Sequence, residues 1–130
     1  MSLLVAVLVM IMTVAAPVSA MTFQDSQSHW AQAAIDKWSG YGVVQGSGGN
    51  FRPNDQITRA EFATMVNNIM QYTDKGDNPF SDVSSEAWYA DALAKLSTAG
   101  VMNGVNGKAL PNNEITRQEA AVILFNAFHI

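Results

Sequence analysis

The chain of 130 residues contains no cysteine. This absence excludes disulfide bridges, a thiolate nucleophile and a lipid-modified cysteine. Basic residues are also few: seven Lys and Arg are scattered singly along the chain against eleven Asp and Glu, which gives a net charge of −4. Nucleic-acid binding needs Lys and Arg gathered on one face. The composition therefore indicates no nucleic-acid partner.

Charged residues are absent from residues 1–20, and Leu3–Val14 is an almost unbroken apolar run. Val18-Ser19-Ala20 then supplies small residues one and three positions before a cut after Ala20. A run this short, followed by small residues, is typical of a secretory signal peptide rather than a membrane span. We therefore expect an exported protein that begins at or near Met21 and keeps no stable membrane span. The positive start of most signal peptides is missing, so an uncleaved anchor is the alternative.

What the chain does contain is an internal repeat with an offset of 58 residues. Ile-Thr-Arg-Ala-Glu at 57–61 returns as Ile-Thr-Arg-Gln-Glu at 115–119. The same offset aligns further identical residues: Trp30 with Trp88, Lys37 with Lys95, Gly46 with Gly104, and Pro53 with Pro111. A shared period of this kind indicates one supersecondary unit that occurs twice.

The first helix of each copy is predicted from helical spacing of apolar residues. Trp30, Ala34 and Trp38 fall on one stripe, with Ser28 as the expected N-cap. We expect these two tryptophans, and Trp88 in the second copy, to lie in the core.

The second helix of each copy follows a glycine-rich loop and opens with a Thr and a Glu three residues apart. Thr58 with Glu61, and Thr116 with Glu119, fit capping boxes. The predicted fold is all-α: two tandem helix-loop-helix repeats packed into one compact helical domain. Residues 1–20 form the signal peptide, 21–72 the first repeat, 73–79 a polar linker and 80–130 the second repeat.

Taken together, these motifs resemble the S-layer homology (SLH) repeat. The likeness rests on Phe-x-Asp at 23–25 and 80–82, the Trp and helix that follow, the Pro-Asn pairs and both Ile-Thr-Arg-x-Glu segments. The resemblance covers about residues 23–70 and 80–128. It implies an exported bacterial module of the cell wall or cell surface that binds cell-wall polysaccharide, often pyruvylated, or peptidoglycan. SLH proteins usually have three repeats around a pseudo-threefold axis, whereas this chain has two.

The expected ligand-binding residues combine this resemblance with the chemistry of helix starts. Arg59 and Arg117 occupy the first helical position, where free N–H groups attract an anion and a guanidinium can grip a carboxylate; an ion pair with a nearby carboxylate is the alternative. Further candidates in the two copies are Thr58 and Thr116, Gly46 and Gly104, and Asp25 and Asp82. Glu61 and Glu119 are assigned to structural capping.

Three functions remain open at this point. The first is a wall anchor that binds polysaccharide in grooves between repeats. The second is an assembly subunit that pairs with another copy or with other SLH proteins, since an unfilled flank tends to recruit a partner. The third is a wall hydrolase with Asp82 and Glu86 as acid and base. We expect no enzyme, because the chain has no Cys nucleophile and each prominent carboxylate has a capping or surface role. We expect no cofactor. We also expect no metal, because His29 and His129 lack further ligands at a recognisable spacing.

Overall fold

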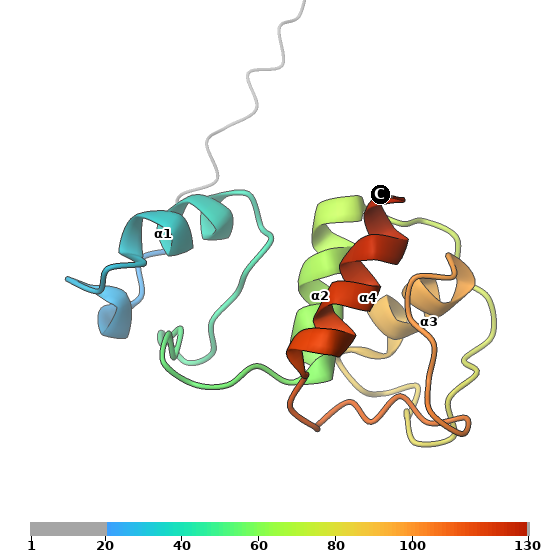
Figure 1. The fold of residues 1–130 in the computed structure, drawn as a ribbon. Helices are drawn as coiled ribbons and strands as arrows, with labels where there is room; N and C mark the ends of the chain where they lie inside the picture. The colour runs from blue at the N-terminus through green and yellow to red at the C-terminus, as the bar shows by residue number, and fades with distance from the viewer. Residues whose placement is uncertain (1–20, 130) are drawn as a thin grey trace, which may run out of the picture.

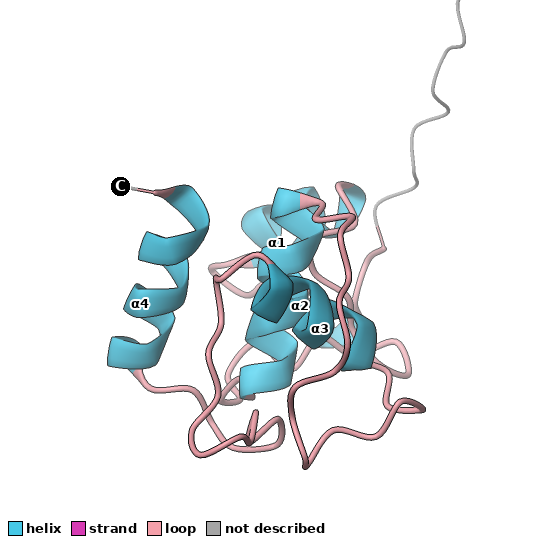
Figure 2. Ribbon diagram, turned by 90° about the vertical axis from the view of Figure 1, so that its right-hand side faces the viewer, coloured by secondary structure: helices cyan, strands magenta, loops and turns pink. Residues whose placement is uncertain are grey.

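The computed structural model describes residues 21–129, which fold into helices joined by loops (Figure 1; Figure 2). The expected signal peptide lies outside the described residues. A 3₁₀ turn, Gln24–Ser26, precedes four helices. The helices are α1 (Gln32–Gly40), α2 (Arg59–Met70), α3 (Ala90–Thr98) and α4 (Arg117–Phe128). Within residues 21–129 there is no β-strand, only isolated bridges. This confirms the predicted all-α fold.

The long helix of the first repeat packs mainly into the second repeat. α2 contacts both α3 and α4, and Figure 1 shows α1 set apart from this group of three helices. Ala60, Ala63 and Val66 of α2 are buried. Small residues here allow the close approach of α3, because short side chains keep the helix axes near one another.

The core lies around α2, α3 and α4. Its buried members are Ala63, Val66, Phe80, Val83, Leu93, Leu96, Val101, Met102, Ala109, Ile123 and Ala127. None of them precedes α2. Apolar burial is the main source of folding free energy, so the stable part of the molecule joins one helix of the first repeat to the whole second repeat.

The prediction that the tryptophans lie in the core is wrong. Trp30 is 91% exposed, Trp38 45% and Trp88 65%. Trp30 and Trp88 precede the helices that they were expected to enter. Trp38 corresponds to Leu96 of α3, which is fully buried against the core. In residues 21–129, no helix covers α1 as α2 covers α3.

The predicted N-cap of the first helix is also wrong. α1 begins after Ala31, which provides no side-chain cap. Ser28 has a φ of 64° and lies in the preceding turn. Its N–H donates to Oε1 of Gln32 at 2.9 Å. The polar group at this end therefore comes from inside the helix, and the chain turns between Ser28 and Ala31 before the helix starts.

Candidate functional site

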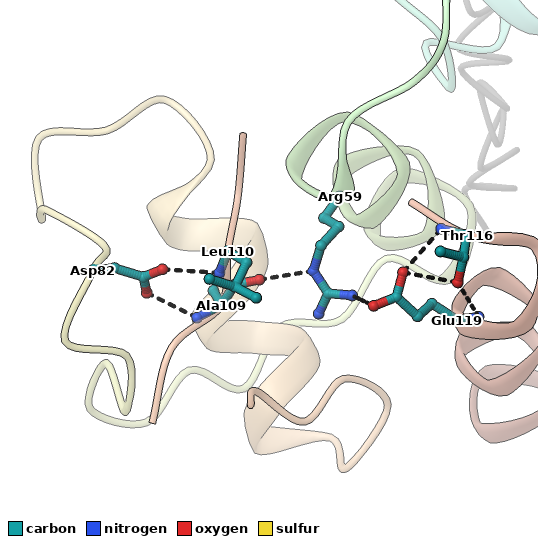
Figure 3. Close-up of polar contacts among 6 residues, drawn as sticks. All are labelled: Arg59, Asp82, Ala109, Leu110, Thr116 and Glu119. Carbon is teal, nitrogen blue, oxygen red and sulfur yellow. Dashed lines mark hydrogen bonds and ion pairs between the residues drawn. The ribbon is translucent and has the colours of Figure 1, made fainter. Parts of the chain in front are cut away.

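Arg59 crosses from the first repeat into the second (Figure 3). Its Nε donates to the carbonyl oxygen of Ala109 at 2.8 Å, and its Nη1 donates to Oε1 of Glu119 at 2.6 Å. The Arg59 side chain is only 5% exposed, against 35% for Glu119. The sequence left open an anion site and an ion pair with a nearby carboxylate. The structure shows an ion pair with Glu119, which ties the two repeats together.

Glu119 has two roles at this contact. Its Oε2 accepts from the N–H of Thr116 at 2.8 Å, and the Thr116 hydroxyl accepts from the N–H of Glu119 at 3.2 Å, which completes a capping box. The other carboxylate oxygen, Oε1, accepts from Nη1 of Arg59. The Thr116 N–H, with a further contribution from Arg59, holds the pKa of the Glu119 carboxyl below its usual value, although burial opposes this. Glu119 is therefore ionised as it meets Arg59.

Asp82 supports the same contact from the other side. Its two oxygens accept from the N–H groups of Ala109 and Leu110 at 2.8 and 2.9 Å. Burial raises the pKa of the Asp82 carboxyl, but these N–H groups outweigh it and the pKa lies below its usual value. A polar chain thus runs from Asp82 through the Ala109 peptide and Arg59 to Glu119 (Figure 3).

The first repeat has the same local parts but a different arginine. Asp25 accepts from the N–H groups of Phe51 and Arg52 at 2.8 and 2.7 Å, and Thr58 forms a capping box with Glu61. The free oxygen of Glu61 is taken by Nη2 of Arg52 at 2.8 Å. No role for Arg52 was predicted from the sequence. The available signal was that Leu110 stands at the equivalent position of the second copy, so the two copies differ in charge there.

Arg117 lies in a different environment from Arg59, despite its equal register. It is exposed, and it makes no hydrogen bond or ion pair with the part of the chain that the structure describes. The structure therefore brings Arg59, Thr116, Glu119 and Asp82 together, and leaves Arg117 outside this group.

The two loop glycines are explained by packing. A side chain at Gly104 would meet the carbonyl oxygen of Lys108 at 2.5 Å and the Phe80 ring at 2.8 Å. Gly46 is crowded in the same way by Asn50 and Phe23. Each glycine lets an aromatic ring close over a tight turn, and this need exists without any ligand.

A shallow pocket of about 160 Å³ lies beside Arg59, between α4 and the loop after α3. Its lining combines apolar side chains with the Glu119 carboxylate and the amides of Asn103, Gln118 and Asn126. A larger pocket of about 250 Å³ lies by the linker, where Asp74 is the charged residue of the lining. The smaller pocket is the better candidate for a sugar, because a guanidinium and amides offer donors that hydroxyls and carboxylates need.

Neither a membrane span nor a metal cluster occurs in the described part of the chain. No helix between residues 21 and 129 has the length and apolarity needed to cross a membrane. In that range no three His, Asp or Glu side chains cluster in a way that could hold a metal ion. His29 bonds to Asn54 at 3.0 Å.

Comparison with known proteins finds surface-layer proteins and also an enzyme. The chain is 41% identical over 105 residues to the surface-layer 125 kDa protein of Lysinibacillus sphaericus, covering 79% of this chain and 9% of that protein. It is 34% identical over 126 residues to the S-layer protein sap of Bacillus anthracis, covering 93% and 16%. An amylopullulanase of Thermoanaerobacterium thermosulfurigenes is 34% identical over 111 residues, covering 84% and 6%.

The chain thus spans 6–16% of the length of these relatives. The match to the amylopullulanase covers only a small part of that enzyme. The matched regions indicate a non-catalytic domain of the anchoring type, in an exported protein of the cell surface or cell wall. The profile of the S-layer homology domain matches residues 22–63 and 79–121, one match in each repeat. The chain belongs to the S-layer homology domain family.

Proposed function

We propose that the pocket beside Arg59 binds a sugar of the cell-wall polysaccharide or peptidoglycan, and that this contact anchors the chain without a covalent bond. The observation that carries the proposal is the state of the guanidinium. Nε and Nη1 are engaged, but Nη2 has no acceptor within residues 21–129. A buried, charged donor thus lines a pocket that also holds three side-chain amides.

The same observation narrows the ligand chemistry. Two of the five N–H donors of Arg59 are engaged, one on Nε and one on Nη1, so both N–H groups of Nη2 remain for a ligand. One carboxylate oxygen or hydroxyl would suffice, and a carboxylate would gain a charge-assisted hydrogen bond. A pyruvate ketal on a sugar carries such a carboxylate, so a pyruvylated polymer is the ligand that we propose.

The test uses Asn103, an exposed residue of the pocket lining. Asn103→Ala should weaken co-sedimentation with purified wall sacculi by about 0.5–1.5 kcal/mol, the range of one hydrogen bond, or roughly two- to twelve-fold. Gln45→Ala is the matched control, because Gln45 is the counterpart of Asn103 in the first repeat. Equal binding by wild type and Asn103→Ala would contradict the proposal.

The hydrolase hypothesis is not supported by the geometry. Both oxygens of Asp82 accept backbone N–H groups, and the depressed pKa keeps the carboxyl ionised. A general acid must hold a proton near the working pH. The assembly hypothesis is favoured by a different set of residues, around Arg117.

A further inference from the structure

We propose that the start of α4 in one molecule docks onto the first repeat of a second copy, with Arg117 taking the place of Arg52 on Glu61. This head-to-tail contact would repeat, between molecules, the contact that joins the two repeats within one molecule. It rests on the exposed faces of α1 and α4 and not on polysaccharide binding.

The contact within the molecule combines backbone bonds with the Arg59 side chain. The N–H groups of Arg59 and Ala60 donate to the carbonyl oxygens of Asn113 and Pro111 at 2.8 and 3.0 Å. The N–H of Ile115 donates back to Ile57 at 3.1 Å. The start of α2 is therefore satisfied by the second repeat, which supplies acceptors for helix N–H groups that no residue of the helix can pair.

We call the face of α2 that enters this contact the donor surface. The same face occurs a second time on α4, where it is exposed. The residues of α2 that are buried at the contact are Arg59, Ala60, Ala63 and Val66. Their counterparts at the 58-residue offset are Arg117, Gln118, Ala121 and Leu124, and all four are exposed. The N–H groups of Arg117 and Gln118 receive no acceptor from residues 21–129. α4 thus presents the face that α2 buries.

We call the surface that receives α2 in the second repeat the acceptor surface; it includes Glu119 and the Ala109 carbonyl. A counterpart of this surface occurs on the first repeat. Glu61 corresponds to Glu119, and the Phe51 carbonyl corresponds to that of Ala109. Ala34 and Trp38 of α1 are exposed where their counterparts in α3, Ala92 and Leu96, are buried. An apolar helix face beside a capped carboxylate is the surface that α2 meets in the second repeat.

In the single molecule, the Glu61 carboxylate of the acceptor surface is already paired with Arg52. Its Nη2 pairs with Glu61 at 2.8 Å, and its Nη1 lies 3.7 Å from Asp55. Arg52 is more than half exposed, and exposed pairs contribute little free energy. A second arginine can therefore displace it at small cost. Arg117 has the complementary charge for Glu61 and Asp55.

The second copy is the occupant that these observations favour, because residues 21–129 carry one uncovered donor face and one acceptor face. Such an interface is heterologous, so it closes into a ring or extends into a chain. We expect association at micromolar concentration, measured by sedimentation velocity on the exported chain.

Two substitutions give opposite expected shifts. Arg117→Glu should weaken association more than about tenfold, because it places like charges together, while a Glu in the first turn of α4 suits the helix dipole and keeps the fold. Arg52→Ala should tighten association roughly two- to five-fold, the size of an exposed ion pair. Lys108→Glu is the matched charge control and should have no effect.

A strict monomer at the highest soluble concentration would overturn the proposal, and so would an oligomer that Arg117→Glu leaves intact. Binding only to a different repeat-bearing protein would also overturn it, since the occupant would not be a second copy. Asn103→Ala should change polymer binding and leave sedimentation velocity unchanged, which separates this proposal from the proposed function.

Discussion

Arg59 and Arg117 are the same residue in the same motif, yet within residues 21–129 only Arg59 lies against another repeat. That second repeat supplies Glu119 and the Ala109 carbonyl as acceptors for Arg59. Arg117 is exposed and pairs with nothing in residues 21–129. A buried guanidinium needs its partners, because a charge without them is costly to bury. The residue type alone therefore does not define its role here.

At the residue scale, Arg59→Ala should lower the free energy of unfolding by about 2–3 kcal/mol. This is below the ~3–5 kcal/mol of a fully buried pair, because Glu119 is partly exposed. Arg117→Ala, the matched control, should change it by less than about 0.5 kcal/mol. Urea denaturation measures both. Equal losses would contradict the assignment of Arg59 to the contact between repeats.

Ionised carboxylates also make stability depend on pH. Glu119 has a depressed pKa in the folded state, so its contribution is present above the usual carboxyl pKa. That contribution is lost as the pH falls through the folded value. The melting temperature should therefore decrease on acidification below about pH 4.5, and Glu119→Gln should flatten this decrease. A pH profile of Glu119→Gln parallel to that of the wild type would argue against the pair.

At the scale of elements, each loop is held by an aspartate from the segment before the first helix of its repeat. Asp82 holds Ala109 and Leu110, and Asp25 holds Phe51 and Arg52. Leu110 and Arg52 both have positive φ, 52° and 60°, a conformation that costs free energy in residues with a Cβ. The paired hydrogen bonds maintain this turn in both copies.

The aspartates should not be equally important for stability. Asp82→Asn should cost about 1–2 kcal/mol, because one of the two N–H groups loses its acceptor and the other keeps only a neutral one. Ala109 also belongs to the core. Asp25→Asn should cost less, since Phe51 and Arg52 lie outside that core. The melting temperatures of the two variants show which substitution destabilises the protein more. A larger loss for Asp25→Asn would mean that the first loop contributes more than its packing indicates.

At the scale of the whole molecule, the packing units do not coincide with the sequence repeats. α2 belongs to the first repeat by sequence and packs with α3 and α4. The main core cluster contains no residue of α1, although Ile35 of this helix is buried. Local stability follows buried apolar contacts, so the part of the molecule around α1 should open more easily than the rest.

Amide hydrogen exchange tests this division. α1 should exchange faster than α2, α3 and α4, which should share similar protection. The comparison of α1 with α3 is internally controlled, because both are nine-residue helices at equivalent positions. Equal protection of α1 and α3 would show that the first repeat is stabilised by contacts other than the core.

The sequence by itself determined the helices and the two capping boxes, because these depend on residues three or four positions apart. Thr58 with Glu61 and Thr116 with Glu119 are such local pairs. The resemblance to the SLH repeat also came from the order of motifs. Only the tertiary structure decided that Arg59 meets a carboxylate 60 residues away and that the tryptophans are exposed. Both depend on which helix covers which face. The repeated sequence offers the same helix face twice, and within residues 21–129 only the face on α2 is covered.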